Sequence, residues 1–85
     1  MKTKVVFRKF KDNNDIIALF PEDVWDHEGN CASYMRVGQH GGADYRGLVY
    51  SGTVKATPKE YRALRQELEN IGYDLKVIER YTRPR

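Results

Sequence analysis

The residues whose side chains could bind a metal or take part in catalysis lie between positions 27 and 44 of the 85-residue chain. His27, Cys31, His40 and Asp44 follow one another at the spacing H-x3-C-x8-H-x3-D. Imidazole, thiolate and carboxylate groups bind borderline metals such as zinc, so these four residues are the candidate metal ligands. Structural zinc sites usually combine two close pairs of cysteine or histidine, whereas this chain has one cysteine. We therefore predict no metal site and no cofactor.

The same stretch contains the residue types of a nucleophilic triad. Cys31 or Ser33 could attack a substrate, with His40 as the base and Asp44 as the group that orients it. No nucleophile elbow follows either candidate nucleophile, and a lone cysteine is more often a small buried hydrophobe. We therefore predict no catalytic residue.

A third kind of site would use positive charge and aromatic rings. A basic sheet face with exposed tyrosines could bind the phosphates of single-stranded nucleic acid and stack its bases. Six candidate binding residues lie close together in the sequence: Tyr34, Arg36, Gln39, His40, Asp44 and Arg46. Other basic or aromatic residues on the expected strands are Lys4, Arg8, Lys9, Lys55, Arg80, Tyr45, Tyr50 and Tyr81. No RNP-like motif accompanies them, and tyrosines in so small a domain also serve its core.

One helix is expected from Thr57 to Gly72. Thr57 has the hydroxyl of an N-cap, Pro58 fits the first helical position, and Glu60 completes a capping box. Gly72 supplies a left-handed stop. The apolar stripe of this helix is formed by residues at spacings of 3, 4 and 3, namely Tyr61, Leu64, Leu68 and Ile71.

Five strands are expected around this helix: Lys4–Lys11, Asp15–Phe20, Cys31–Val37, Tyr45–Lys55 and Tyr73–Tyr81. The apolar run in the second strand predicts a central position with both faces covered, and Pro21 is expected to end it. Val24 and Trp25 are expected to hold the acidic connection to the body of the domain. The segment Gly38–Asp44 is expected to be a glycine-rich loop. The order β-β-β-β-α-β predicts an α+β fold, with a mostly antiparallel five-stranded sheet and one helix packed across one face.

Length and composition indicate one domain, residues 1–85, with 40% hydrophobic residues, which is typical of a globular chain. The apolar run at the N-terminus stops at Phe7, too early for a signal peptide, and no run approaches the length of a membrane span. A single cysteine cannot form a disulfide within the chain. We therefore expect a cytoplasmic protein that does not contact membranes.

The net charge of +3 is unevenly distributed. Residues 1–11 carry five Lys or Arg and no acid, whereas residues 12–30 carry six Asp or Glu and no base. This pattern indicates either partial neutralisation within the domain or a surface with two poles.

Several of these segments resemble a family of small uncharacterised bacterial proteins that occurs in gut anaerobes and their mobile elements. The resemblance covers nearly the whole chain, and its segments are residues 7–10 (FRKF), 15–21 (DIIALFP), Cys31, 33–34 (SY), 37–41 (VGQHG) and 73–75 (YDL). It implies no activity, cofactor or partner. Members of the family can carry histidine where this chain has Arg36, so one potential metal ligand is missing here.

With a well-marked fold and no coherent catalytic set, the sequence favours an accessory or interaction module that acts by binding and not by catalysis. The expected binding region is Cys31–Asp44 with the strand ends around it, and the partner is an unidentified protein or a second copy of the chain in a homodimer. The alternative is binding of single-stranded nucleic acid on the basic, tyrosine-bearing face, with an affinity that falls steeply as salt rises.

Overall fold

The computed structural model describes residues 2–35 and 39–79, with the side chain of Gln39 left out. The α+β class is confirmed, but the sheet has six strands and a second helical segment is present. In chain order the elements are β1 (Thr3–Phe10), β2 (Ile16–Val24), β3 (Cys31–Met35), β4 (Gln39–Ala43), α1 (Tyr45–Gly47), the π-helical η1 (Leu48–Gly52), β5 (Thr53–Lys55), α2 (Pro58–Asn70) and β6 (Leu75–Val77).

The sheet is mixed and has the order β4-β3-β2-β1-β5, with β6 also paired to β1. The neighbours from β4 to β1 and the β1–β5 pair are antiparallel, whereas β6 runs parallel to β1. Two strands therefore pair along the same edge of β1. β6 pairs with its residues 3–5, and β5 pairs with its last three residues. The expectation of five strands missed this division.

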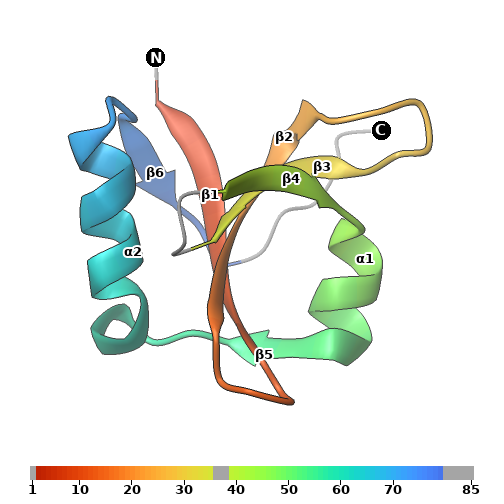
Figure 1. Ribbon diagram of the computed structural model, residues 1–85, viewed down its shortest axis with the longest axis horizontal. Coiled ribbons are helices and arrows are strands. Elements are labelled where there is room, and N and C mark those ends of the chain that lie inside the picture. The colour runs from red at the N-terminus through yellow and green to blue at the C-terminus, as the bar shows by residue number, and fades with distance from the viewer. Residues whose placement is uncertain (1, 36–38, 80–85) are drawn as a thin grey trace.

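The two helical segments lie on opposite faces of the sheet (Figure 1). Under α2 the core contains Val5, Phe7, Ala18, Phe20, Tyr34, Ala56, Leu64, Leu68 and Leu75. Under α1 and η1 it contains Val6, Ile17, Leu19, Cys31 and Ala43. Because β2 contributes to both clusters, its continuous apolar run is explained and its predicted central position is confirmed.

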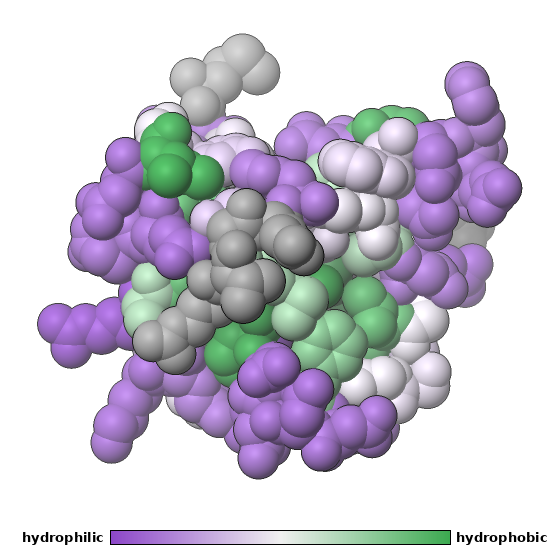
Figure 2. Space-filling model, in the orientation of Figure 1, coloured by the Kyte–Doolittle hydropathy of each residue, from purple (hydrophilic) through white to green (hydrophobic). Residues whose placement is uncertain are grey.

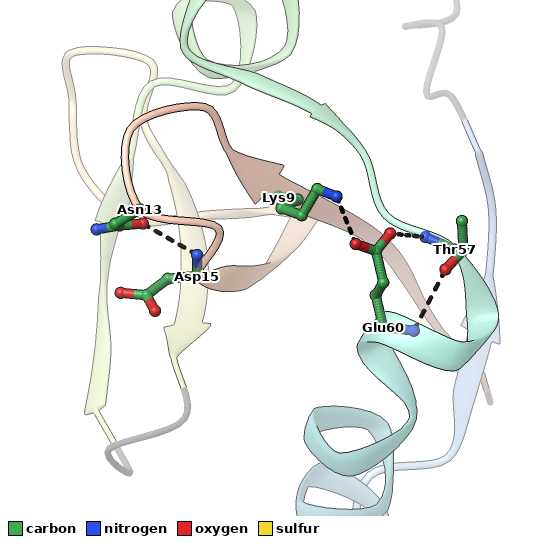
Figure 3. Close-up of polar contacts among 5 residues, drawn as sticks. All are labelled: Lys9, Asn13, Asp15, Thr57 and Glu60. Atoms are coloured by element: carbon green, nitrogen blue, oxygen red, sulfur yellow. Dashed lines mark hydrogen bonds and ion pairs between the residues drawn. The ribbon is translucent and has the colours of Figure 1, made fainter.

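The predicted start of α2 is confirmed in detail (Figure 3). The Thr57 hydroxyl accepts from the backbone N–H of Glu60 at 3.3 Å, and the Thr57 N–H donates to the Glu60 carboxylate at 2.9 Å. The second carboxylate oxygen of Glu60 accepts from Lys9 Nζ on β1. The capping box therefore also attaches the helix to the sheet.

Acid is expected to weaken this attachment. The bond from Lys9, followed by the bond from the Thr57 N–H, lowers the pKa of Glu60 from its ordinary value of 4.5 to about 2. A folded-state pKa below the unfolded one adds stability above pH 4.5, and this stability is lost as the pH falls from about 4.5 toward 2. Thermal melts at a series of pH values should show the loss. In Lys9→Met the melting temperature should depend less on pH over this range. An unchanged pH dependence in that variant would contradict the role of this ion pair.

The apolar stripe of α2 is correct except at its end. Leu64 and Leu68 are buried and Tyr61 packs against the core, whereas Ile71 is 53% exposed. Ile71 is the C-cap residue, and the chain turns at Gly72, whose φ is +113°. The turn moves Ile71 off the helical stripe before it can reach the sheet.

Two strand ends differ from the sequence prediction. Pro21 does not end β2, because the strand continues to Val24 with a register shift between Phe20 and Val24. A bulge of this kind tolerates a residue without a backbone N–H. The last strand was expected over Tyr73–Tyr81, but β6 comprises only Leu75–Val77, and Tyr81 lies outside the described residues.

The segment expected to be the fourth strand is mostly helical. Asp44 caps α1 by accepting a 3.3 Å hydrogen bond from the Gly47 N–H, and only Thr53–Lys55 forms a strand. Leu48 and Val49 pack against the core on this face, whereas Tyr50 is 68% exposed.

Arg8 connects β1 to this helical segment. Its Nε donates to Thr53 Oγ1 at 3.0 Å, and its Nη2 donates to the carbonyls of Val49 at 3.0 Å and Thr53 at 3.1 Å. Thr53 Oγ1 in turn donates to the Leu48 carbonyl at 2.6 Å. The guanidinium therefore satisfies carbonyl groups that a π-helix leaves free at its end.

The surface seen in Figure 2 is hydrophilic along the outside of α2, and hydrophobic side chains gather between the two helical layers. Among the described residues no helix is long and apolar enough to cross a membrane.

Candidate binding edge of the sheet

The strand β4 forms one edge of the sheet, in a segment expected to be a loop. Its residues pair with β3 from Met35↔Gln39 to Cys31↔Ala43, and its other side pairs with no strand in the described parts of the chain. Among the described residues, the outer backbone N–H and C=O groups of β4 therefore form no ladder with a further strand.

The opposite edge of the sheet is built differently. There β5 and β6 are three residues long, and each contains a lysine, Lys55 and Lys76. Short edge strands and edge lysines are two devices that oppose pairing with another chain. By contrast, β4 has five residues, no charged side chain, and a bare backbone at Gly41 and Gly42. The edges thus differ in how readily they accept a further strand.

Trp25 lies over the bare backbone of β4. A Cβ atom built on Gly42 would overlap Cδ1 and Nε1 of the indole, so this position has room only for glycine. Trp25 is 50% exposed and its neighbour Val24 is 81% exposed. The prediction that both residues hold the connection to the body is therefore wrong for Val24, while Trp25 packs on the sheet and keeps half of its surface open.

Gly42→Ala is expected to displace this indole. The overlap should cost about 1 to 3 kcal/mol of unfolding free energy and shift the emission of Trp25, the single tryptophan, toward longer wavelength. Gly41→Ala is the matched control, because a Cβ there meets only Ser33 Oγ at 3.9 Å. Equal emission spectra for the two variants would show that the indole does not lie over Gly42.

His40 is held at the same edge by two tyrosines. Its Nε2 lies 2.9 Å from Tyr73 Oη, and its ring meets the Tyr34 ring edge-on with centroids 4.7 Å apart. Tyr73 itself stacks on Phe20 at 5.2 Å. His40 is nevertheless exposed, so the imidazole is fixed in place while part of it faces solvent.

Tyr34 is a structural member of this group. It is 4% exposed, and a hydrogen bond with Glu67 followed by burial raises the pKa of its hydroxyl above the ordinary value. The other Glu67 oxygen, Oε2, is buried and has no hydrogen-bond partner among the described residues. The phenol donates to the Glu67 carboxylate, so Tyr34 is attached to α2 as well as to His40.

The candidate metal and triad residues are divided between the two faces of the sheet. Cys31 is buried under α1, where burial is the main cause that raises the pKa of its thiol, whereas His40 packs on Tyr34 at the α2 face. Ser33 is buried and donates to the Gly41 carbonyl at 2.9 Å, and Asp44 caps α1. His27 lies in the β2–β3 connection. Within the described residues no group of three or more His, Cys, Asp or Glu could hold a metal.

Of the six predicted binding residues, His40 lies on β4, Tyr34 is buried beside it, and Asp44 and Arg46 lie in the turn that follows. Arg36 and the Gln39 side chain lie outside the described residues. Three strand lysines pair with acids: Lys4 with Glu22, Lys9 with Glu60 and Lys55 with Glu79. Of these three pairs, only Lys4–Glu22 joins the basic segment 1–11 to the acidic segment 12–30.

A pocket of about 410 Å³ lies between the β1–β2 turn, the end of β3 and the start of α2. Its lining is Asn14, Asp15, Ile16, Met35, Glu60, Ala63 and Leu64. The Glu60 carboxylate is already bound by Lys9 and Thr57, and the Asp15 N–H is engaged by Asn13 in the turn (Figure 3). The pocket therefore offers few polar groups to a ligand.

Comparison with known proteins adds no relative, since no protein-family model, curated protein or solved structure matches this chain.

Two members of the β4 edge were missed in the sequence. Tyr73 lies far from His40 along the chain, and only the packing of α2 against the sheet brings the two side chains together. Trp25 was expected to hold the acidic connection to the body of the domain, and not to lie at an edge of the sheet. The sequence did contain a signal for Trp25, because glycine in a strand often marks a close approach by another group. Gly41 and Gly42 could therefore have indicated that a large side chain such as Trp25 packs on them.

Proposed function

We propose that this protein is a non-catalytic interaction module that binds an extended segment of a protein partner along β4. The observation that carries the proposal is the open, uncharged outer edge of a five-residue strand, in a sheet whose other edge strands are short and contain lysine. In strand addition the main chain supplies affinity, and alternate side chains supply specificity.

The surroundings of the edge support this kind of binding. His40 and Trp25 project on the α2 side of β4 and would contact alternate side chains of an added strand. Their rings are positioned before a partner arrives, because Tyr34 and Tyr73 contact His40 while Gly42 lies under Trp25. Such preorganisation reduces the entropy lost on binding.

Peptides selected from a displayed random library provide the test. An amide-resolved NMR titration with a selected peptide should shift the resonances of residues 39–43 and the Trp25 indole. The same peptide with N-methylated backbone amides keeps its side chains but cannot pair, and it should not bind. Shifts confined to the pocket beside α2, or equal binding of the methylated peptide, would contradict the proposal.

Nucleic-acid binding has less support. Lys4, Lys9 and Lys55 are paired with acids, and Arg8 is occupied by hydrogen bonds to the α1–η1 segment. Both sheet faces are also covered, and of the tyrosines that the structure describes only Tyr50, on η1, is exposed. A single-stranded oligonucleotide that shifted the amides of Arg46 and the strand lysines, with a strong salt dependence, would favour this alternative.

A further inference from the structure

We infer that the segment added to β4 is the β4 strand of a second copy, so that the protein forms a twofold dimer around Gly41. This inference rests on the function proposed above and names the partner. The two strands would run antiparallel, with the axis perpendicular to the sheet. The two six-stranded sheets would then form one continuous sheet of twelve strands.

The register follows from the length of β4. When Gly41 faces its own copy, His40 faces Gly42 and Gln39 faces Ala43 of the partner copy, so all five residues pair. No charged side chain of β4 meets its own copy in this arrangement. Gly41 leaves open space at the axis, where the nearest group to a built Cβ is Ser33 Oγ at 3.9 Å.

The side chains on the α2 face are complementary to themselves in this register. His40 faces Gly42 of the partner copy, and Gly42 is the residue that lies under Trp25. The exposed part of each His40 ring would therefore meet the half-exposed indole of the other copy, and symmetry makes this contact twice. Facing positions in antiparallel strands are about 4.5 to 5.5 Å apart, which is close enough for aromatic contact.

Pairing of β4 with itself also gives a closed assembly. A contact between β4 and the β5–β6 edge of another copy would be heterologous and would propagate into a filament. The lysines and the short lengths of β5 and β6 oppose that contact. Among the described strands, β4 is the edge suited to pairing, and each molecule would use it once.

Opposite charges at the axis provide the test. In Gly41→Glu and in Gly41→Lys the new side chain faces an identical charge, so each variant alone should self-associate at least roughly tenfold more weakly than the original chain. An equimolar mixture of the two should recover the dimer, because Glu then faces Lys. Sedimentation velocity measures the assembly, and Trp25 emission on dilution reports the same edge.

Ala63→Glu and Ala63→Lys are the matched controls, since Ala63 is exposed on α2 and is not part of β4, and both should dimerise as the original chain does. Circular dichroism checks that every variant is folded. Dimers in the separate Gly41 variants, or no recovery in the mixture, would overturn the twofold arrangement. An original chain that is monomeric at every concentration overturns the dimer but not the proposed function, which the peptide titration described above tests separately.

Discussion

Leu68→Ala is expected to lower the free energy of unfolding by on the order of 2 to 5 kcal/mol. Leu68 is fully buried in the cluster between α2 and the sheet, beside Phe20 and Val5. Truncation removes apolar contacts and leaves a cavity that the neighbouring β-strands cannot close. Small domains have total stabilities of only about 5 to 15 kcal/mol, so the thermal midpoint should fall by many degrees.

Ile71→Ala is the informative control for this prediction. The sequence places Ile71 on the same apolar stripe as Leu68, but the structure leaves it 53% exposed at the helix end. Its truncation should change stability by no more than about 0.5 kcal/mol, as is usual for surface positions. Equal losses for Leu68→Ala and Ile71→Ala in denaturant titrations would mean that α2 docks differently.

The features that the sequence predicts well are those decided by neighbouring residues. The start of α2 depends on Thr57 and Glu60, which are three positions apart and bond to each other. In β1 the strand period of two places Val5 and Phe7 in the cluster under α2 and Val6 in the cluster under α1. Local rules succeed here because no distant contact opposes them.

The features that the sequence mispredicts depend on distant contacts. Gly41 and Gly42 have low strand propensity, yet they form β4 because β3 supplies the ladder and Trp25 covers the bare backbone. A turn rich in glycine has the same local signal. Only the presence of β3 beside this segment distinguishes the two outcomes.

The α1–η1 segment contains a signal that pointed to the correct structure. Tyr45, Leu48 and Val49 recur at helical spacing after Asp44, a good N-cap residue. Tyr45–Lys55 was instead expected to be one strand, in which Gly47 and Gly52 would permit a bulge or a close approach. The helical turn forms because its apolar side chains cover the second face of the sheet.

The same contrast applies to the binding edge. His40 was chosen from the sequence because histidine is chemically versatile, and the structure places it on β4. Its partners could not be chosen in this way, since Tyr34 and Tyr73 reach it through sheet pairing and helix docking. Chemical type indicates candidate residues, whereas their grouping requires the tertiary structure.

Arg8→Ala should show how far the packing of the α1–η1 segment on the sheet depends on one side chain. The variant loses three hydrogen bonds to Thr53 and Val49 and leaves two carbonyl groups without this donor. Hydrogen bonds to charged groups contribute about 1.5 to 3 kcal/mol each and are not additive, so we expect a total loss on the order of 3 kcal/mol. Hydrogen exchange should rise first in residues 45–53, while the amides of α2 remain protected.

Two further variants distinguish the effect of the guanidinium hydrogen bonds from the effect of the positive charge. Arg8→Lys keeps the charge but cannot place donors on both carbonyls and the Thr53 hydroxyl, so it should recover only part of the loss. Lys55→Ala removes a basic residue from the neighbouring strand, where the ion pair with Glu79 is solvent-exposed, and should cost less than about 1 kcal/mol. If Arg8→Ala cost no more than Lys55→Ala, the apolar contacts of Leu48 and Val49 alone would be sufficient to hold the π-helical turn on the sheet.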